Sequence, residues 1–169
     1  MTERETENET EHEIDQRHFR DVLGHFPTGV TVVTSSGQEG PVGITIGSFT
    51  SVSLDPPLVA WLPTRDSGTW AQIREQGHFC VNVLAHDQDW LSNKMAGTGD
   101  DKFAEVEFEE GPTGAPRLKG AVAWLDCEIE AVHEAGDHDI VVGRVKHLEV
   151  ADSEAPPLIF HRGKYRTVS

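Results

Sequence analysis

Three short segments carry side chains that could bind a ligand or take part in a reaction. The first, residues 43–53, reads Gly-Ile-Thr-Ile-Gly-Ser-Phe-Thr-Ser-Val-Ser and combines small residues with hydroxyl groups. A strand with so little side-chain bulk often marks a place where a ligand approaches the backbone. A flat ring could lie against this strand, with backbone N–H and C=O groups facing the polar edge of the ring. An edge strand with a solvated hydroxyl face is an equally good interpretation of the pattern alone.

The second segment, residues 65–70, places an arginine and two hydroxyl groups at the start of a predicted helix. It reads Arg-Asp-Ser-Gly-Thr-Trp. The free N–H groups and positive dipole end of a helix N-terminus suit a phosphate monoester, as do two hydroxyls and a guanidinium. The candidate phosphate ligands are therefore Arg65, Ser67 and Thr69. Ordinary N-capping by Ser67 explains the serine equally well.

The third segment, Gly136-Asp-His138, is predicted to form the tip of a long hairpin between strands at about 121–133 and 139–150. A tight turn accounts for the glycine and the aspartate. His138 is the informative residue, because an imidazole could donate a hydrogen bond to a substrate carbonyl or supply a proton. A solvated turn histidine is the alternative interpretation.

Other chemistries lack the motifs they require. None of the nine histidines falls in an HExxH, HxH or Cys-x-x-Cys arrangement, so we predict no metal site. No serine lies in a GxSxG elbow, which argues against a hydrolase triad. Glu109 and Glu110 are adjacent in a predicted loop and would point apart, which argues against a glycosidase.

The elements that must position these segments are mostly predicted strands, joined by turns rather than by regular crossover helices. Helices are predicted after Asp15, from Ser67 to Glu75 and from Asp87 to Met95. This order favours a mainly β fold, an antiparallel sheet closed into a barrel with two or three helices packed outside. No GxGxxG motif follows the first predicted strand, so a doubly wound dinucleotide fold is not expected.

Length and charge narrow the function classes further. The 169 residues suit one domain, and 14 basic against 29 acidic residues give a net charge of −15. Such a chain should repel phosphate backbones, so we expect no nucleic-acid partner. No stretch reaches about 18 apolar residues and no signal peptide is visible, so no membrane association is expected. Cys80 and Cys127 lie in separate apolar runs, which predicts buried thiols, no disulfide and a cytoplasmic location.

The charge is concentrated at the N-terminus. Residues 1–15 contain seven acidic side chains and one arginine, with almost nothing to bury. We therefore expect a disordered acidic tail over residues 1–15 and a folded domain over residues 16–169.

Taken in order and spacing, these segments resemble the flavin reductase family, whose members are small NAD(P)H:flavin oxidoreductases that supply reduced flavin to two-component monooxygenases. The similar segments cover nearly the whole predicted domain: 19–34, 43–59, 67–69, 79–84, 101–103, 136–138, 143–145 and 161–165. The resemblance implies an FMN-binding split β-barrel and a homodimer with the flavin near the subunit interface. It also implies hydride transfer from NADH or NADPH to FMN, with FAD as the other possible flavin, and a transient monooxygenase partner.

The resemblance also assigns residues to the site. It places the isoalloxazine ring at Thr45, Ile46, Gly47 and Ser48, where this chain has Ile-Gly in place of the Ala-Asn common in the family. It places the flavin phosphate at Ser67 and Thr69, with Arg65. The remaining assignments are Lys102 and Phe103 from the loop after the third helix, Arg162 and Tyr165 near the pocket mouth, and His138 beside the nicotinamide as the catalytic candidate.

Two other functions fit the same barrel. One is a flavin-binding protein that does not turn over, such as a carrier or sensor. The other is an FMN oxidoreductase that acts on another substrate. The histidine at the tip of the 121–150 hairpin favours the reductase, because a pure flavin binder would not need a residue that faces the nicotinamide.

Overall fold

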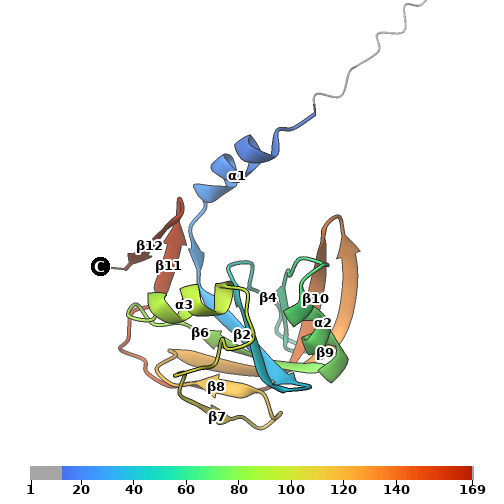
Figure 1. The fold of residues 1–169 in the computed structure, drawn as a ribbon, viewed down its shortest axis with the longest axis vertical. Coiled ribbons are helices and arrows are strands. Elements are labelled where there is room, and N and C mark those ends of the chain that lie inside the picture. Colours follow the sequence, from blue (N-terminus) through green and yellow to red (C-terminus); the bar gives the residue numbers. More distant parts are fainter. Residues whose placement is uncertain (1–12, 169) are drawn as a thin grey trace, which may run out of the picture.

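The structure is a computed structural model that describes residues 13–168 (Figure 1). The first twelve residues of the predicted acidic tail lie outside the described residues. Residues 13–15 are exposed and precede the first helix, and Asp15 caps that helix by accepting a hydrogen bond from the backbone N–H of Arg17 at 2.9 Å. None of the helices described here is long and apolar enough to span a membrane.

Three helices and twelve strands make up the described chain. The helices are α1 (Gln16–Gly24), α2 (Gly68–Gln76) and α3 (Asp89–Ala96). The strands are β1 (Thr28–Gly29), β2 (Thr31–Gly37), β3 (Gly40–Ile46), β4 (Thr50–Ser53), β5 (Leu58–Trp61), β6 (His78–Val83), β7 (Phe108–Glu110), β8 (Pro116–Leu118), β9 (Ala123–Ala135), β10 (His138–Val150), β11 (Leu158–His161) and β12 (Lys164–Thr167).

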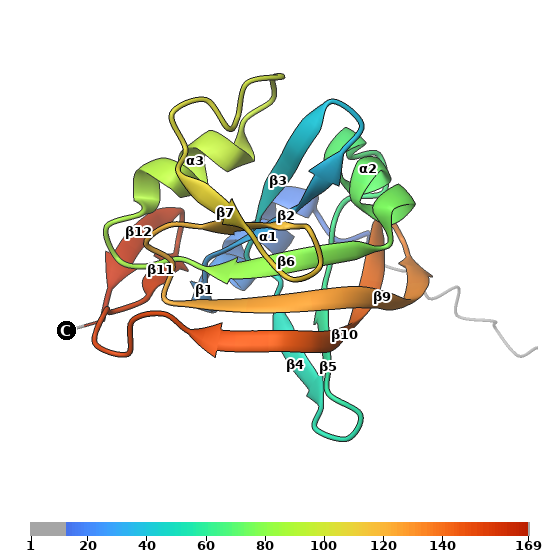
Figure 2. The same cartoon turned by 90° about the horizontal axis from the view of Figure 1, so that it is seen from below.

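The main sheet has seven antiparallel strands in the order β3-β2-β6-β9-β10-β5-β4. Figure 2 shows β6, β9 and β10 running side by side across it. The predicted antiparallel sheet with few helices is confirmed. The predicted closure is not: β3 and β4 stand at opposite ends of the hydrogen-bonded order of the described strands and do not pair. The reason is local, because the predicted single strand over residues 42–53 breaks after Ile46, and the chain turns before it resumes at Thr50.

Two apolar clusters lie against this sheet. Trp61, Trp70 and Phe79 are fully or almost fully buried in the first, where their rings meet edge to face at 5.3 and 5.6 Å. The second cluster includes Leu84, Leu91 and Met95 and packs α3 onto the sheet. Cys80 and Cys127 are both buried and free, as predicted.

The hairpin of β9 and β10 is the longest element of the fold, and its thirteen-residue strands agree with the predicted hairpin. It pairs with β6 on one side and β5 on the other. Gly143 allows this packing, because a Cβ there would lie 2.4 Å from the ring of Phe79. The hairpin therefore carries its tip, residues 136–138, to a fixed place beside the segment that follows β5.

Helix α1 stands away from the rest of the molecule (Figure 1). The predicted helix is present, but none of its residues is buried. Its apolar residues Phe19 and Leu23, and Phe26 just beyond its end, are more than half exposed. A hydrogen bond from the backbone N–H of Arg162 to the Gly24 carbonyl, at 2.9 Å, links its end to the β11–β12 turn.

Candidate functional site

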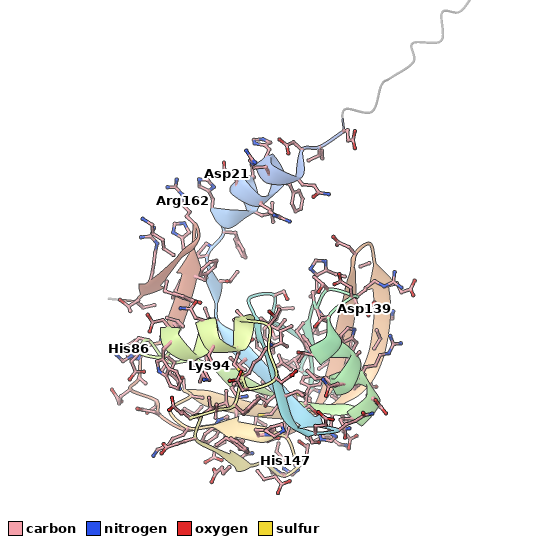
Figure 3. The ribbon with its side chains drawn as sticks, viewed as in Figure 1. Asp21, His86, Lys94, Asp139, His147 and Arg162 are labelled. Carbon is pink, nitrogen blue, oxygen red and sulfur yellow. The ribbon has the colours of Figure 1, made fainter. Side chains whose placement is uncertain are left out.

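A cleft of about 1150 Å³ separates α1 from the tip of the β9–β10 hairpin. Its floor is the end of β3 and the turn after it, and the segment 62–64 continues the wall toward the hairpin. Arg162 lies on the opposite side, beside the end of α1 (Figure 3). Six of the predicted site residues thus line one cavity: Thr45, Ile46, Gly47, Ser48, His138 and Arg162.

The side chains of the floor are engaged within the protein. Thr45 donates from Oγ1 to the Ser92 carbonyl at 2.6 Å, and Ile46 is buried in the core. The hydroxyl of Ser48 accepts from the Leu62 N–H at 3.0 Å. At Gly47 a Cβ would lie only 3.2 Å from the Thr28 hydroxyl. The floor therefore offers a ligand mainly backbone at Gly47.

His138 is fixed at the hairpin tip by its backbone and by its neighbour. It forms an isolated β-bridge with Thr64, and its Nδ1 lies 2.7 Å from the carboxylate of Asp137. This hydrogen bond lowers the pKa of the Asp137 carboxyl below its usual value. The imidazole is part-exposed, and its Nε2 has no hydrogen-bond partner among residues 13–168. The Nε2 atom of His138 can therefore donate or accept a hydrogen bond at the cleft.

A second, smaller cavity of about 270 Å³ brings together Thr69, Lys102 and Phe103. Lys102 donates from Nζ to the carbonyls of Gly43 and Met95, at 3.2 and 3.0 Å. Partial burial lowers the pKa of its ammonium group. This cavity and the cleft lie along the same strand, because Gly43 lines the first and Thr45 the second.

Ser67 acts as the N-cap of α2. Its hydroxyl accepts from the Trp70 N–H at 3.2 Å, which is the ordinary capping role that the sequence left open.

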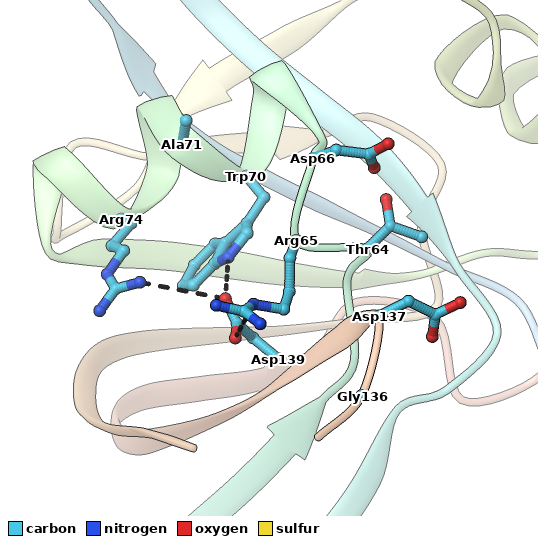
Figure 4. Close-up of a pocket in the computed structure, with 9 residues that line it drawn as sticks. All are labelled: Thr64, Arg65, Asp66, Trp70, Ala71, Arg74, Gly136, Asp137 and Asp139. Carbon is cyan, nitrogen blue, oxygen red and sulfur yellow. Dashed lines mark hydrogen bonds and ion pairs between the residues drawn. The ribbon is translucent and has the colours of Figure 1, made fainter. Parts of the chain in front are cut away.

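Arg65 and Tyr165 lie apart from both cavities. Arg65 faces a third cavity of about 620 Å³ (Figure 4), where its guanidinium pairs with Glu134 at 2.8 Å and Asp139 at 3.5 Å. Tyr165 points toward α3, and its hydroxyl bonds Ser92 and Asn93 at 2.8 and 2.9 Å. The structure therefore separates these two residues from the other candidates.

Sequence reasoning missed the residues of α1 that line the cleft. Phe19, Arg20 and Leu23 form this wall, together with Phe160 from β11. A signal was present, because the segments that resemble the flavin reductase family begin at residue 19 and so include these positions of α1. Among residues 13–168, no group of three His, Cys, Asp or Glu side chains is arranged to hold a metal ion.

Comparison with known proteins gives a consistent family. Residues 23–169 match the family described as "Flavin reductase like domain". A flavin reductase from Pseudomonas putida is 48% identical over 153 residues, which cover 90% of this chain and 89% of the relative. The reductase subunit of a flavin-dependent monooxygenase from Rhodococcus jostii is 46% identical, over 90% of this chain and 77% of the relative.

Solved structures agree. Component B of nitrilotriacetate monooxygenase from Mycobacterium thermoresistibile superposes with a TM-score of 0.89 at 41% identity, covering 92% of this chain and 87% of that chain. An NADH:FAD oxidoreductase from Streptomyces globisporus, solved in complex with NAD and FAD fragments, superposes with a TM-score of 0.87 at 38% identity. That match covers 92% of this chain and 93% of the other.

Proposed function

This chain belongs to the flavin reductase family, and from that premise we propose that its cleft of about 1150 Å³ is where a flavin and a nicotinamide meet. The protein is an oxidoreductase that reduces flavin with a nicotinamide nucleotide, and it acts as the reductase component for a flavin-dependent monooxygenase. The observation that carries the assignment of the cleft is the convergence of residues 45–48, His138 and Arg162 on one cavity.

The residues of the cleft fit a flavin ring. Apolar side chains of α1 and β11 line one side, and the backbone around Gly47 lines the other. The absence of a Cβ at Gly47 leaves a shallow cradle beside the Thr28 hydroxyl. A ring with a polar edge can stack in such a place and exchange hydrogen bonds with backbone groups, whereas a bulky branched ligand cannot.

The phosphate end of FMN is assigned to the smaller cavity. Lys102 supplies a positive charge there, and Thr69 supplies a hydroxyl within the first turn of α2, whose N-terminus favours an anion. Lys102 has three N–H donors, of which two are used by carbonyl groups. The third donor is free to meet a phosphate oxygen. We therefore propose Lys102, in place of the Arg65 expected from the sequence, as the cationic residue that binds the phosphate.

The protein's own part in the reaction is to position the flavin and nicotinamide rings and to exclude water from them. A bound flavin supplies the hydride acceptor and a bound reduced nicotinamide supplies the hydride. The residues of this chain need to hold the two rings face to face in a cavity closed to solvent. His138 orients the nicotinamide through the nitrogen that Asp137 leaves free, and the apolar wall of α1 keeps water from the rings.

We propose further that the protein is a homodimer in the cytoplasm. The apolar face of α1 is exposed at Phe19, Val22 and Leu23, and Phe26 just beyond the helix is exposed too, with 51–73% of each residue accessible. An isolated nine-residue helix is marginal in water, so it requires a covering surface. A second copy of the chain is the occupant that the family resemblance favours, and it would complete the open side of the cleft. The free buried thiols fit the reducing cytoplasm.

The test of the function is an anaerobic absorbance assay. Purified protein is mixed with FMN or FAD and with NADH or NADPH in turn, and the flavin band near 450 nm is followed. We expect rapid bleaching that requires the protein. Flavin that binds but stays oxidised with both donors would contradict the reductase function and favour a carrier or sensor.

The dimer has its own measurement. Sedimentation equilibrium should give twice the 18.6 kDa chain mass for the unmutated protein. Replacing Leu23 and Phe26 together by serine should shift the population toward a monomer, with Val52→Ser, an exposed apolar residue outside the cleft, as the control. An unmutated protein that sediments as a monomer would overturn the dimer without affecting the flavin assay.

A further inference from the structure

The third cavity, which the proposed function leaves unused, contains a buried carboxylate that ties two parts of the site together. Asp139 is 3% exposed, although it follows directly after His138 at the start of β10. Buried carboxylates are costly unless they are paired and hydrogen-bonded. Its Oδ2 accepts from the indole N–H of Trp70 at 2.8 Å, and the Arg65 and Arg74 guanidiniums lie 3.5 and 3.9 Å from its oxygens (Figure 4).

The backbone around Asp139 strengthens the same link. The N–H of Asp139 donates to the Pro63 carbonyl at 3.0 Å, and the N–H of Arg65 donates to the Asp137 carbonyl at 3.0 Å. The segment that enters α2 is therefore joined to the hairpin tip both by main chain and by side chain. That segment continues into the first turn of α2, where Thr69 lines the proposed phosphate cavity.

The two neighbours at the strand start face different cavities. Successive side chains of a strand point to opposite faces. In agreement, Asp139 lines the third cavity and His138 lines the cleft. The hydrogen bond and ion pairs that hold the Asp139 carboxylate in place therefore also fix the strand from which the His138 imidazole projects.

We propose that Asp139 is a positioning residue for His138, and that Trp70 and Arg65 act with it. These three residues, Asp139, Trp70 and Arg65, form a clamp. The clamp sets the distance between the hairpin tip and the N-terminus of α2, and therefore the placement of the nicotinamide relative to the flavin. Arg65 holds this clamp rather than the phosphate. The inference rests on the proposed function, in which His138 contacts the nicotinamide.

The test compares Asp139→Asn with a matched control on the same hairpin, Glu130→Gln. Glu130 also pairs with an arginine, Arg144, through two contacts of 2.9 Å, but both side chains are exposed and away from the cavities. The first readout is hydrogen exchange of the Arg65 and Asp139 amides, whose carbonyl partners lie across the clamp. We expect Asp139→Asn to accelerate both at least tenfold relative to Glu130→Gln.

The second readout is nicotinamide binding without turnover. The dissociation constant of NAD⁺, measured by calorimetry on the full chain, should rise about tenfold in Asp139→Asn, and the KM for NADH should rise with little change in kcat. In a His138→Ala background the same substitution should add less than twofold, because its effect passes through the missing imidazole.

Three outcomes would overturn the proposal. The first is that Asp139→Asn binds NAD⁺ as Glu130→Gln does, the second that its effect adds fully to that of His138→Ala, and the third that the two amides exchange at the unmutated rate. If Asp139→Asn does not fold, Trp70→Phe, which removes the indole N–H but keeps a ring, carries the same comparisons. A failure of the proposed function is distinct, because the unmutated protein would then not reduce flavin at all.

Discussion

At the scale of single residues, the floor of the proposed flavin cleft presents backbone at Gly47, because the neighbouring hydroxyls are hydrogen-bonded within the protein. The Thr45 hydroxyl donates to the Ser92 carbonyl, and the Ser48 hydroxyl exchanges hydrogen bonds with the Leu62 main chain. Gly47 contributes space beside the Thr28 hydroxyl, because it has no side chain. The sequence pattern predicted a place for a ring, but it could not say that the hydroxyls would turn inward, because that depends on strands distant in the chain.

Gly47→Val tests this view. A Cβ at Gly47 would lie 3.2 Å from the Thr28 hydroxyl, and the two added methyl groups would occupy the cradle. We expect flavin affinity to fall by about tenfold or more, since a filled site loses its ring contacts. Flavin titration followed by absorbance gives the affinity. Gly29→Ala, where a Cβ meets nothing within 4 Å, should bind flavin normally. Unchanged binding by Gly47→Val would move the ring elsewhere.

Lys102 is the second residue whose role can be isolated. Lys102→Met keeps most of the side-chain volume and removes the charge. A charge-assisted hydrogen bond contributes roughly 1.5–3 kcal/mol. FMN should therefore bind about 10- to 100-fold more weakly, whereas riboflavin, which lacks the phosphate, should change little. Calorimetry with both ligands measures this difference. An equal loss for FMN and riboflavin would indicate a structural role in tying α3 to β3.

At the scale of elements, the β7–β8 hairpin is attached to the sheet by a buried ion pair. Asp126 on β9 is fully buried and accepts from Arg117 on β8 at 2.8 and 3.1 Å and from Thr113 at 3.0 Å. The side chain of Arg117 is only 12% exposed and also lies over the Trp124 ring. The network therefore ties the β7–β8 turn and β8 to the main sheet through Thr113 and Arg117.

Asp126→Ala should be strongly destabilising. It leaves the Arg117 guanidinium buried without its main partner, a change that costs about 3–5 kcal/mol. The free energy of unfolding in urea measures the loss. Glu130→Ala, which breaks the exposed pair with Arg144, should leave the free energy of unfolding almost unchanged, because solvent screens an exposed pair. Similar losses for both variants would mean that the buried pair contributes no more than a surface one.

The elements also show how far sequence alone could go. Period and turn residues predicted α2, capped by Ser67, and the β9–β10 hairpin, because both are set by local propensity. They did not predict that the strand after Gly40 ends at Ile46, which leaves the sheet open. Nor did they place Arg65, whose partners Glu134 and Asp139 are about seventy residues away. Such long-range pairing carries no local sequence signal.

At the scale of the whole molecule, charge opposes the fold. The 29 acidic residues exceed the 14 basic ones, so carboxylates outnumber Lys and Arg side chains by 15. Most of the ion pairs of the described chain are exposed, as in Lys119 with Glu107, and such pairs contribute little. Repulsion among the unpaired carboxylates should therefore outweigh the attraction lost when salt screens the pairs.

This balance predicts the sign of the salt effect on stability. Raising sodium chloride from about 20 mM to 500 mM shortens the Debye length from roughly 20 Å to about 4 Å, which screens repulsion between distant carboxylates first. We expect the thermal midpoint to rise by several degrees, measured by calorimetry at pH 7. A variant that lacks residues 1–12, and with them a net charge of −4, should show a smaller rise. A midpoint that falls with salt would mean that exposed ion pairs such as Lys119–Glu107, which salt screens, dominate the electrostatics of this fold.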